Sequence, residues 1–307
     1  MKNMNKQDIA STLYRKVREK QLKDFKSRMP SDKQGVEFTH NGITYVAAIR
    51  RLTPTECAKL QTVPDDYEFS TSETQQYRCL GNGWTIEVIK HILDFLPKET
   101  KKSMRVLSLF DGMSCGQIAL KEIGANVTTY LASEIDKHAI ANTQHNFPNT
   151  VQLGSVTDLN TEKIVEKYGM PDILIGGSPC QSFSFSGKMK GMSTKSGEEI
   201  YTLEHYLELK RQGFEFEGQS YLFWEYMRIL TELRKYNPNI YFLLENVKML
   251  EKWERCLSNA IGVRGVHINS ALVSAQQRKR IYWSNIRTRQ VENGKLFSDE
   301  EDNDPFA

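Results

Sequence analysis

Short apolar segments, separated by segments with helical character, run through the chain from residue 104 onward and constrain its fold more than any other feature. The segments predicted as strands cover residues 106–110, 127–132, 151–153, 173–175 and 240–244, and residues 266–286 are predicted to form two strands joined by a turn around 274–279. Strands that alternate with helices predict an α/β fold with a mostly parallel, doubly wound sheet. Ligands of such sheets bind beyond the carboxyl ends of the strands, so functional residues are expected there.

The first hundred residues have a different organisation. Residues 5–28 predict a basic helix, for which the alternative interpretation is an ordinary solvated surface helix. A second helix is predicted to begin at Thr53, because the sequence Thr-Pro-Thr-Glu forms a capping box with proline at the first helical position. A third helix is predicted over residues 86–96, with one apolar face. The polar, charged residues 97–103 that follow are the best candidate for a linker.

Charge is unevenly distributed along the chain. The 307 residues carry a net charge of only +3, and this total taken alone argues weakly against a nucleic-acid-binding protein. Residues 1–30, however, contain nine Lys and Arg against three Asp and Glu, whereas residues 292–307 contain one Lys against six Asp and Glu. An acidic tail therefore masks a basic head, and only the head is electrostatically suited to phosphates.

Several protein classes are excluded by composition. The five cysteines form no C-x-x-C pair, so neither a zinc knuckle nor a disulfide framework is indicated. No apolar run approaches the length that spans a bilayer, and the first residues lack the apolar core of a secretory signal. We therefore expect a protein of the cytoplasm that binds neither a metal nor a membrane.

The first two predicted strands end in residues suited to a nucleoside. Gly112 and Gly116 allow close backbone approach at the start of a helix. Glu134 ends the second strand, where a carboxylate can accept hydrogen bonds from ribose hydroxyls. This pattern fits NAD, FAD or a nucleoside cofactor alike. Asp111 argues against a pyrophosphate and favours a cationic amino-acid head group, as in S-adenosylmethionine.

Three further positions carry candidate chemistry. Cys180 follows a strand in the sequence GGSPCQSFS, where it is either a small apolar filler or a nucleophile, and the Gly-, Ser- and Gln-rich surroundings favour the nucleophile. Glu245, after the strand at 240–244, is either a solvated helix cap or a carboxylate that holds a ligand. Arg278 and Arg280, between the last two strands, form either a charged hairpin tip or a clamp for an anion or carbonyl.

These residues together resemble the DNA cytosine-C5 methyltransferase family. The similarity rests on FDGMSCG at 110–116, GGSPCQSFS at 176–184, ENV at 245–247 and QQRKRIYW at 276–283. Residues 50–96 resemble the two motifs that usually close the family's chain, so this chain resembles a circularly permuted member. GQSYLFWEY at 218–226 is most similar to phage-type and eukaryotic de novo enzymes. The resemblance implies a Rossmann-like sheet that uses S-adenosylmethionine to methylate duplex DNA.

The resemblance also implies catalytic roles. A thiolate of Cys180 would add to C6 of a flipped-out cytosine. Glu245 would hold N3 and the exocyclic amine, Arg280 would contact O2, and Arg278 would hold the adjacent phosphate and loop. The residues implied to contact DNA or to form the closing loop are Gln181, Ser182, Ser184, Arg50 and Arg51. Two alternatives remain: methylation of RNA, such as tRNA, and a non-catalytic scaffold that binds DNA or a partner.

The resemblance implies a set of residues that contact S-adenosyl-L-methionine, and this chain differs from the family at one of these positions. The implied contacts are Asn82, Trp84, Phe110, Asp111, Gly112, Ser114, Cys115, Gly116, Glu134, Ile135 and Pro179. After Gly154 the family commonly has an Asp that binds the adenine amine, and this chain has Ser155. Asp158 lies too far along the chain to be predicted as the replacement for this Asp. The backbone of Val156 is an alternative contact for the adenine.

The permutation would also divide the target-recognition region. This region would be split between residues 284–307 and 1–49, which is short and predicts a short target sequence. A second subunit or a homodimer could supply the rest. The predicted parts are a basic head with part of the recognition region (1–49), the permuted closing motifs (50–96), a linker (97–103), the catalytic core (104–286) and an acidic tail (287–307). The expected location is the cytoplasm of a bacterial or phage-infected cell.

Overall fold

The computed structural model describes residues 51–179 and 192–287 in full, and the backbone of four short strands outside those ranges. The chain divides after Thr53 into two compact units. The first contains an antiparallel hairpin of β1 (Gly35–His40) and β2 (Ile43–Ala48). The second contains all the other elements that the structure describes. The basic helix predicted over 5–28 lies outside the described residues.

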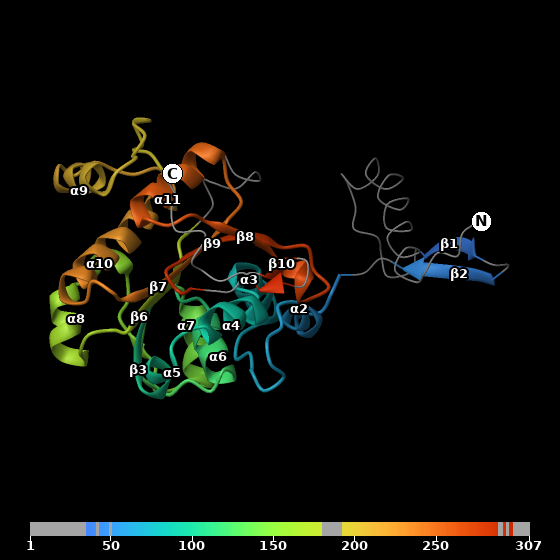
Figure 1. Ribbon diagram of the computed structural model, residues 1–307. Helices are drawn as coiled ribbons and strands as arrows, with labels where there is room; N and C mark the ends of the chain where they lie inside the picture. The colour runs from blue at the N-terminus through green and yellow to red at the C-terminus, as the bar shows by residue number, and fades with distance from the viewer. Residues whose placement is uncertain are drawn as a thin grey trace. The chain divides into compact units, whose positions relative to one another are not determined.

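The second unit is built on one seven-stranded sheet with the order β5-β4-β3-β6-β7-β9-β8 (Figure 1). Its strands are β3 (Met104–Leu109), β4 (Val127–Ser133), β5 (Val151–Gln152), β6 (Ile173–Gly177), β7 (Tyr241–Val247), β8 (Val266–Asn269) and β9 (Lys279–Ser284). The first five strands in this order are parallel, and β9 runs antiparallel to both β7 and β8. The predicted α/β, doubly wound, mostly parallel sheet is therefore confirmed. A separate two-stranded ladder, β10 (Val291–Glu292) with β11 (Lys295–Leu296), lies within the predicted acidic tail.

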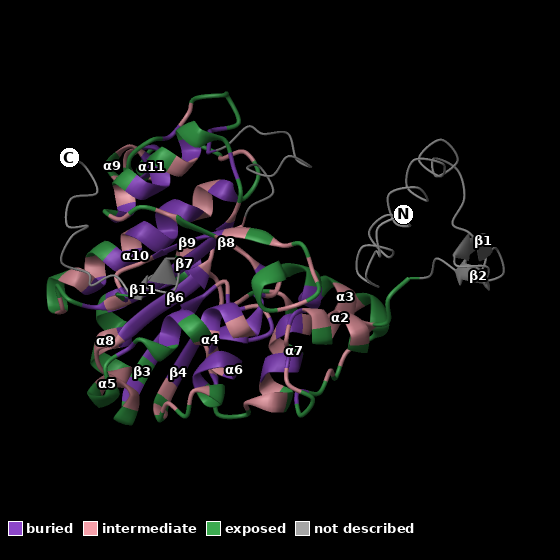
Figure 2. Cartoon of the chain, turned by 45° about the vertical axis from the view of Figure 1, so that its right-hand side comes forward, coloured by how far each residue is buried: buried purple, intermediate pink, exposed green. Residues whose placement is uncertain are grey.

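Helices cover both faces of this sheet, which explains why the central strands β3, β6 and β7 are largely buried. One face is covered by α4 (Ile86–Asp94), α6 (Cys115–Glu122) and α7 (Lys137–Asn146), whose buried side chains pack with Val106 and Ile175. The other face is covered by α8 (Thr161–Tyr168), α10 (Phe223–Tyr236) and α11 (Glu251–Ile261), which pack with Leu107 and Leu174. Figure 2 shows the buried strands between these two layers.

The segment before β3 is an integral part of this unit. It contains α2 (Pro54–Leu60), α3 (Glu73–Asn82) and α4, and α4 buries Ile86, Ile89 and Leu93 completely. The helix predicted to begin with Pro54 as its first residue and the apolar-faced helix predicted from residue 86 are both present. Residues 97–103, expected to be a linker, contain the short helix α5 (Lys98–Lys102), in which Lys101 Nζ pairs with Asp94 Oδ1 at 2.9 Å.

Two strand ends differ from the sequence-based expectation. The segment Glu245-Asn246-Val247, expected to follow a strand, lies inside β7, because β9 pairs with β7 as far as Val247 opposite Arg280. Likewise, Gly176 and Gly177 belong to β6 rather than to the loop after it. Among the described residues, no helix is both long and apolar enough to cross a bilayer.

Candidate active site

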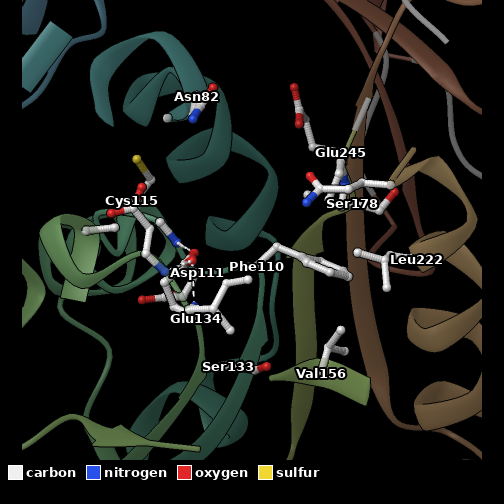
Figure 3. Close-up of a pocket in the computed structure, with 18 of the residues that line it drawn as sticks. Asn82, Phe110, Asp111, Cys115, Ser133, Glu134, Val156, Ser178, Leu222 and Glu245 are labelled. Carbon is white, nitrogen blue, oxygen red and sulfur yellow. Dashed lines mark hydrogen bonds between the residues drawn. The ribbon is translucent and has the colours of Figure 1, made fainter. Parts of the chain in front are cut away.

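A cavity of about 520 Å³ lies at the carboxyl ends of β3, β4, β6 and β7, where the topology predicts a ligand (Figure 3). The segment before β3 also contributes to its wall, through the end of α3 and the residues before α4. Many of its lining residues are those singled out from the sequence. The predicted site residues that line it are Asn82, Trp84, Phe110, Asp111, Gly112, Cys115, Glu134, Ile135, Ser155, Val156, Pro179, Glu245, Arg278 and Arg280.

The turn after β3 is held in an unusual backbone conformation. Phe110, Gly112 and Ser114 have φ values of 57°, 59° and 62°. These values lie in the left-handed region, which residues other than glycine rarely adopt. The hydroxyl of Tyr67, from the segment between α2 and α3, donates to the Met113 carbonyl at 2.9 Å and fixes the turn from outside. Non-glycine residues kept in this region commonly mark functional sites, because the surrounding structure must maintain the strain.

Asp111 is a buried carboxyl group at the base of this turn. It accepts a 2.5 Å hydrogen bond from Ser114 Oγ and a 2.8 Å hydrogen bond from the Tyr130 hydroxyl. Burial raises the pKa of Asp111 to about 6, although hydrogen bonds from Ser108, Ser114 and Tyr130 oppose the rise. The carboxyl group predicted to meet a cationic head group therefore also holds the turn together.

Glu134 is fixed by backbone donors at the end of β4. Its Oε2 accepts from Gly112 N at 2.8 Å, and its Oε1 accepts from Ile135 N at 2.7 Å and Asp136 N at 2.8 Å. These bonds tie the β3 turn to the β4 turn and set the orientation of the carboxylate. Each carboxylate oxygen can accept more than one hydrogen bond, so the fixed group can still receive ribose hydroxyls.

An apolar part of the cavity lies on one side of these carboxyl groups. Figure 3 shows Phe110, Val156 and Leu222 gathered there, with Asn82 and Cys115 on the opposite side. Ile135 also lines the cavity and is 70% exposed, which is unusual for a large aliphatic side chain. Apolar side chains around a concave opening suit a flat aromatic ligand.

A second buried carboxyl group lies at the β6–β7 edge of the cavity. Glu245 is 8% exposed, and its Oε1 lies 2.8 Å from Arg280 Nε. Burial raises the pKa of Glu245, while the positive charges of Arg280 and Arg278 oppose the rise. Gly177 pairs with Glu245 in the sheet, and a Cβ at Gly177 would lie 2.8 Å from Trp84 Nε1 and 3.1 Å from Glu245 Oε2. Glycine at this position therefore leaves room for the side chains of Trp84 and Glu245.

Arg278 has a different partner from Arg280. Its NH2 group donates to the carbonyl oxygens of Gly81 at 3.1 Å and Gly83 at 2.7 Å. It therefore holds the loop at the end of α3, and the phosphate contact predicted for it remains a prediction. The next residue in that loop, Trp84, donates its backbone N–H to Cys115 Sγ at 3.3 Å. Burial raises the pKa of the Cys115 thiol to about 12, so this cysteine is neutral.

Asn246 positions the chain just before the candidate nucleophile. Its side-chain amide donates to Ser178 Oγ at 2.9 Å and to the Ser178 carbonyl at 3.2 Å. Pro179 is the last described residue of this segment, and it lines the cavity. The predicted residues Cys180, Gln181, Ser182, Ser184 and Arg50 lie outside the described residues. Asn246 belongs to the ENV segment that the sequence points to, but the sequence does not show that its partner is Ser178.

Three other predicted site residues are described but do not line the cavity. Ser114 is buried and bonds to Asp111. Gly116 packs against β6, where a Cβ would lie 2.2 Å from Ile175 Cδ1. Arg51 is exposed and belongs to the first compact unit.

Sequence reasoning missed several lining residues. Arg78 and Asp136 form an ion pair of 3.2 Å at the wall, and Thr157, Gln219 and Tyr221 also line the cavity. The stretch that contains Gln219 and Tyr221 resembles a family in sequence, but no pattern in it predicts a wall of the site. Within the described ranges, no group of three His, Cys, Asp or Glu side chains is arranged to hold a metal ion.

Comparison with known proteins identifies relatives with similar sequences. The orphan methyltransferase M.Rho11sI of Bacillus phage rho11s is 30% identical over 217 residues, which are 66% of this chain and 37% of that protein. The DNA (cytosine-5)-methyltransferase DRM2 of Oryza sativa subsp. japonica is 28% identical over 191 residues, which are 60% of this chain and 28% of that protein. The chain thus matches less than two fifths of the length of either relative.

One solved structure and one family model complete the comparison. A crystal structure of a Spodoptera frugiperda DNMT2 mutant aligns with 59% of this chain and 49% of that chain, at 20% identity and a TM-score of 0.42. The model of the C-5 cytosine-specific DNA methylases matches residues 1–98 and 104–263, which is more than half of the chain. The chain therefore belongs to the C-5 cytosine-specific DNA methylase family.

Proposed function

We propose that this chain is a DNA (cytosine-5)-methyltransferase that uses S-adenosyl-L-methionine. The observation that carries the proposal is the position of Glu245. It is buried, paired with Arg280 and adjacent in the sheet to Gly177, which precedes Cys180 by three residues in the sequence. A protonatable carboxyl group and a guanidinium side by side can present both a donor and an acceptor to one edge of a base.

The chemistry of the cavity fits the proposed methyl donor. Phe110, Val156 and Leu222 offer apolar surface to adenine, and the fixed Glu134 carboxylate offers acceptors to ribose hydroxyls. Asp111 offers a negative charge to the ammonium of the methionine part. A volume of about 520 Å³ lies within the usual range for small-molecule sites. When bound, S-adenosyl-L-methionine supplies an electrophilic methyl group on a sulfonium.

The residues of the chain would divide the reaction between them. Addition of the Cys180 thiolate to C6 of cytosine moves an electron pair through the ring, so N3 becomes more basic and C5 becomes nucleophilic. Glu245 would donate a hydrogen bond or a proton to N3, and its raised pKa favours the protonated form that this needs. Arg280 would contact O2. After methyl transfer, loss of the C5 proton and departure of the thiolate restore the aromatic ring.

Two finer features of the family assignment also belong to this proposal. We infer a circular permutation in which residues 50–96 are the closing motifs, 97–103 the join and 104–286 the catalytic core. Support comes from Gln276, whose Nε2 donates to Leu60 O at 2.7 Å and to Gln61 Oε1 at 2.9 Å. These bonds attach the end of α2 to the segment just before β9. The phage and rice relatives support a relationship to phage-type and de novo enzymes.

The remaining expectations concern partners and location. Duplex DNA is the proposed substrate, with target recognition shared by residues 1–49 and 284–307, and with a second subunit or homodimer as a further source of recognition. The phage relatives support action in the cytoplasm of a phage-infected or bacterial cell.

Incubation of the full chain with methyl-labelled S-adenosylmethionine and either duplex DNA or tRNA tests the activity. We expect label in duplex DNA, and we expect Cys180→Ala to reduce transfer to background. Cys256→Ala is the matched control, because Cys256 is a buried thiol of α11 that does not line the cavity. Label only in tRNA would replace DNA by RNA as the substrate, and label in neither would favour a non-catalytic scaffold.

A further inference from the structure

Trp84 and Glu245 meet beside one position of β6, although they come from distant parts of the chain. A Cβ at Gly177 would lie 2.8 Å from Trp84 Nε1 and 3.1 Å from Glu245 Oε2, so the indole N–H and the carboxyl group border the same small gap. Both side chains line the cavity, and each residue is only 8% exposed. The carboxyl group proposed to meet the base therefore lies beside an indole from the segment before β3.

The loop that carries Trp84 is fixed by contacts of its main chain. Arg278 NH2 donates to the carbonyl oxygens of Gly81 at 3.1 Å and Gly83 at 2.7 Å, and Trp84 N donates to Cys115 Sγ at 3.3 Å. The loop is also closely packed, because a Cβ at Gly83 would lie 3.2 Å from Cys115 Sγ. These contacts do not involve the indole, so the main chain at residue 84 keeps its place when the side chain is changed.

The two oxygens of Glu245 lie beside different donors. Oε1 is 2.8 Å from Arg280 Nε, and Oε2 lies on the side of Trp84. Burial raises the pKa of Glu245, and the charges of Arg280 and Arg278 together with a hydrogen bond from the Trp84 side chain oppose the rise. An indole N–H and a guanidinium can only donate, so neither takes the proton that Glu245 carries. A donor beside each oxygen opposes rotation of the carboxyl group about its last bond.

We propose that Trp84 is a positioning residue that holds the Glu245 carboxyl group in the orientation in which it meets the edge of the flipped-out cytosine. The inference rests on the proposed function and adds a residue to the same site. The family resemblance implies Trp84 only as a contact of S-adenosyl-L-methionine. Its ring lines the cavity, and its N–H lies beside Glu245, so one side chain borders both the cofactor cavity and the group that binds the base.

Trp84→Phe in the full chain removes the N–H and keeps an aromatic ring at the cavity wall. We expect kcat for methyl transfer to duplex DNA, at saturating S-adenosylmethionine, to fall about tenfold or more, because a hydrogen bond to a charged group is lost. The affinity for S-adenosylhomocysteine, measured by calorimetry, should change little. Trp224→Phe is the matched control and should leave kcat unchanged. Trp224 is fully buried in α10, and within the described residues its Nε1 has no hydrogen-bond partner.

The pH profile of kcat separates positioning from a purely structural role. The N–H of Trp84 favours the ionised form of Glu245, so Trp84→Phe should raise the apparent pKa that Glu245 contributes to the profile, by up to about one pH unit. The other charged or titratable described groups beside Glu245 are Arg278, Arg280 and Tyr282, which the variant retains. Trp224→Phe should leave the profile unchanged.

The failure of this inference differs from the failure of the proposed function. A higher KM for S-adenosylmethionine with kcat and its pH profile unchanged in Trp84→Phe would show that Trp84 is only a cofactor contact. An equal loss of kcat in Trp84→Phe and Trp224→Phe would show that any missing indole has the same effect. Either result would overturn the positioning role and leave the proposed function intact. No methyl transfer to DNA by the unaltered chain would overturn both.

Discussion

At the scale of single residues, the site depends on two buried carboxyl groups with different surroundings. Asp111 is bonded to the hydroxyls of Ser114 and Tyr130, whereas Glu245 lies beside the guanidinium of Arg280. Burial raises the pKa of both. The neutral partners of Asp111 suit its proposed role of attracting a cation, and the charged partner of Glu245 suits its proposed role of exchanging a proton with a base. Pairs of acids in unlike environments commonly have unlike roles.

The pKa of Asp111 predicts how cofactor affinity changes with pH. Only the ionised carboxylate attracts an ammonium, so the affinity for S-adenosylhomocysteine should rise with pH and level off above about 6. Below that value the affinity should fall by up to about tenfold per pH unit, because an α-ammonium stays protonated throughout this range. Binding measured by calorimetry between pH 5 and 7 checks this, with Asp111→Asn expected to bind more weakly and without the slope. A native affinity that does not change from pH 5 to 7 would show that Asp111 does not bind the head group.

At the scale of elements, close contact between strands and turns sets the shape of the cavity. β6 ends in two glycines, and a Cβ at Gly176 would lie 2.9 Å from the Leu109 carbonyl of β3 and 3.2 Å from the buried Tyr226 ring of α10. Neither neighbour can move freely, because one is sheet backbone and the other is fully buried. Glycine at this position therefore lets β3, β6 and α10 approach each other behind the site.

The substitution Gly176→Ala should destabilise the protein by about 1–3 kcal/mol, as expected for overpacking in a filled core. Urea unfolding of the full chain measures this free energy. The matched control is Gly81→Ala, which lies in α3 with no atom within 4 Å of its added Cβ and should be neutral or stabilising. Similar unfolding free energies for the two variants would mean that the close approach at Gly176 carries no energetic cost.

Local sequence pattern predicted some elements and not others. The apolar periodicity of 86–94 and the apolar run of β3 specified those elements, because their burial follows from their own sequence. The extension of β7 through Glu245 depends on pairing with β9, which no local pattern shows. The bonds of Asn246 to Ser178 and of Arg278 to the α3 loop join residues that are far apart in the chain. The identities of many site residues were therefore predictable, whereas most of their partners were not.

At the scale of the whole molecule, helices from the start of the chain complete a site built by its middle. Buried Gln61 donates to Leu80 O at 2.8 Å, and Gln276 donates to Gln61 from the segment before β9. Thr85 Oγ1 joins the same network by donating to Gln61 Oε1 at 3.0 Å, and it also bonds to Ser270 Oγ at 2.7 Å. This polar network connects the segment that carries Asn82 and Trp84 to the far edge of the sheet. Buried networks of this kind fix one arrangement of the elements they join.

The charge distribution predicts how the two ends of the chain affect DNA binding. Replacing the Lys and Arg residues of 15–28 by Gln should lower DNA affinity and reduce its dependence on salt, because fewer counterions are released. Deleting residues 292–307, which carry a net charge of −5, should leave affinity unchanged or raise it. Fluorescence anisotropy with duplex DNA at two salt concentrations measures both effects. Weaker binding after deletion of the tail would contradict this account of the charge.

Trapping with duplex DNA that contains 5-fluorocytosine tests the central claim most directly. Fluorine at C5 cannot leave as a proton does, so the adduct between the thiolate and C6 should persist after methyl transfer. We predict a covalent complex between the chain and the DNA that requires S-adenosylmethionine, with the modified base on Cys180 in a peptide map by mass spectrometry. Cys180→Ala should give no complex and Cys256→Ala a normal one. Methylation of ordinary DNA without a trapped complex, or a complex at another residue, would contradict the proposed chemistry.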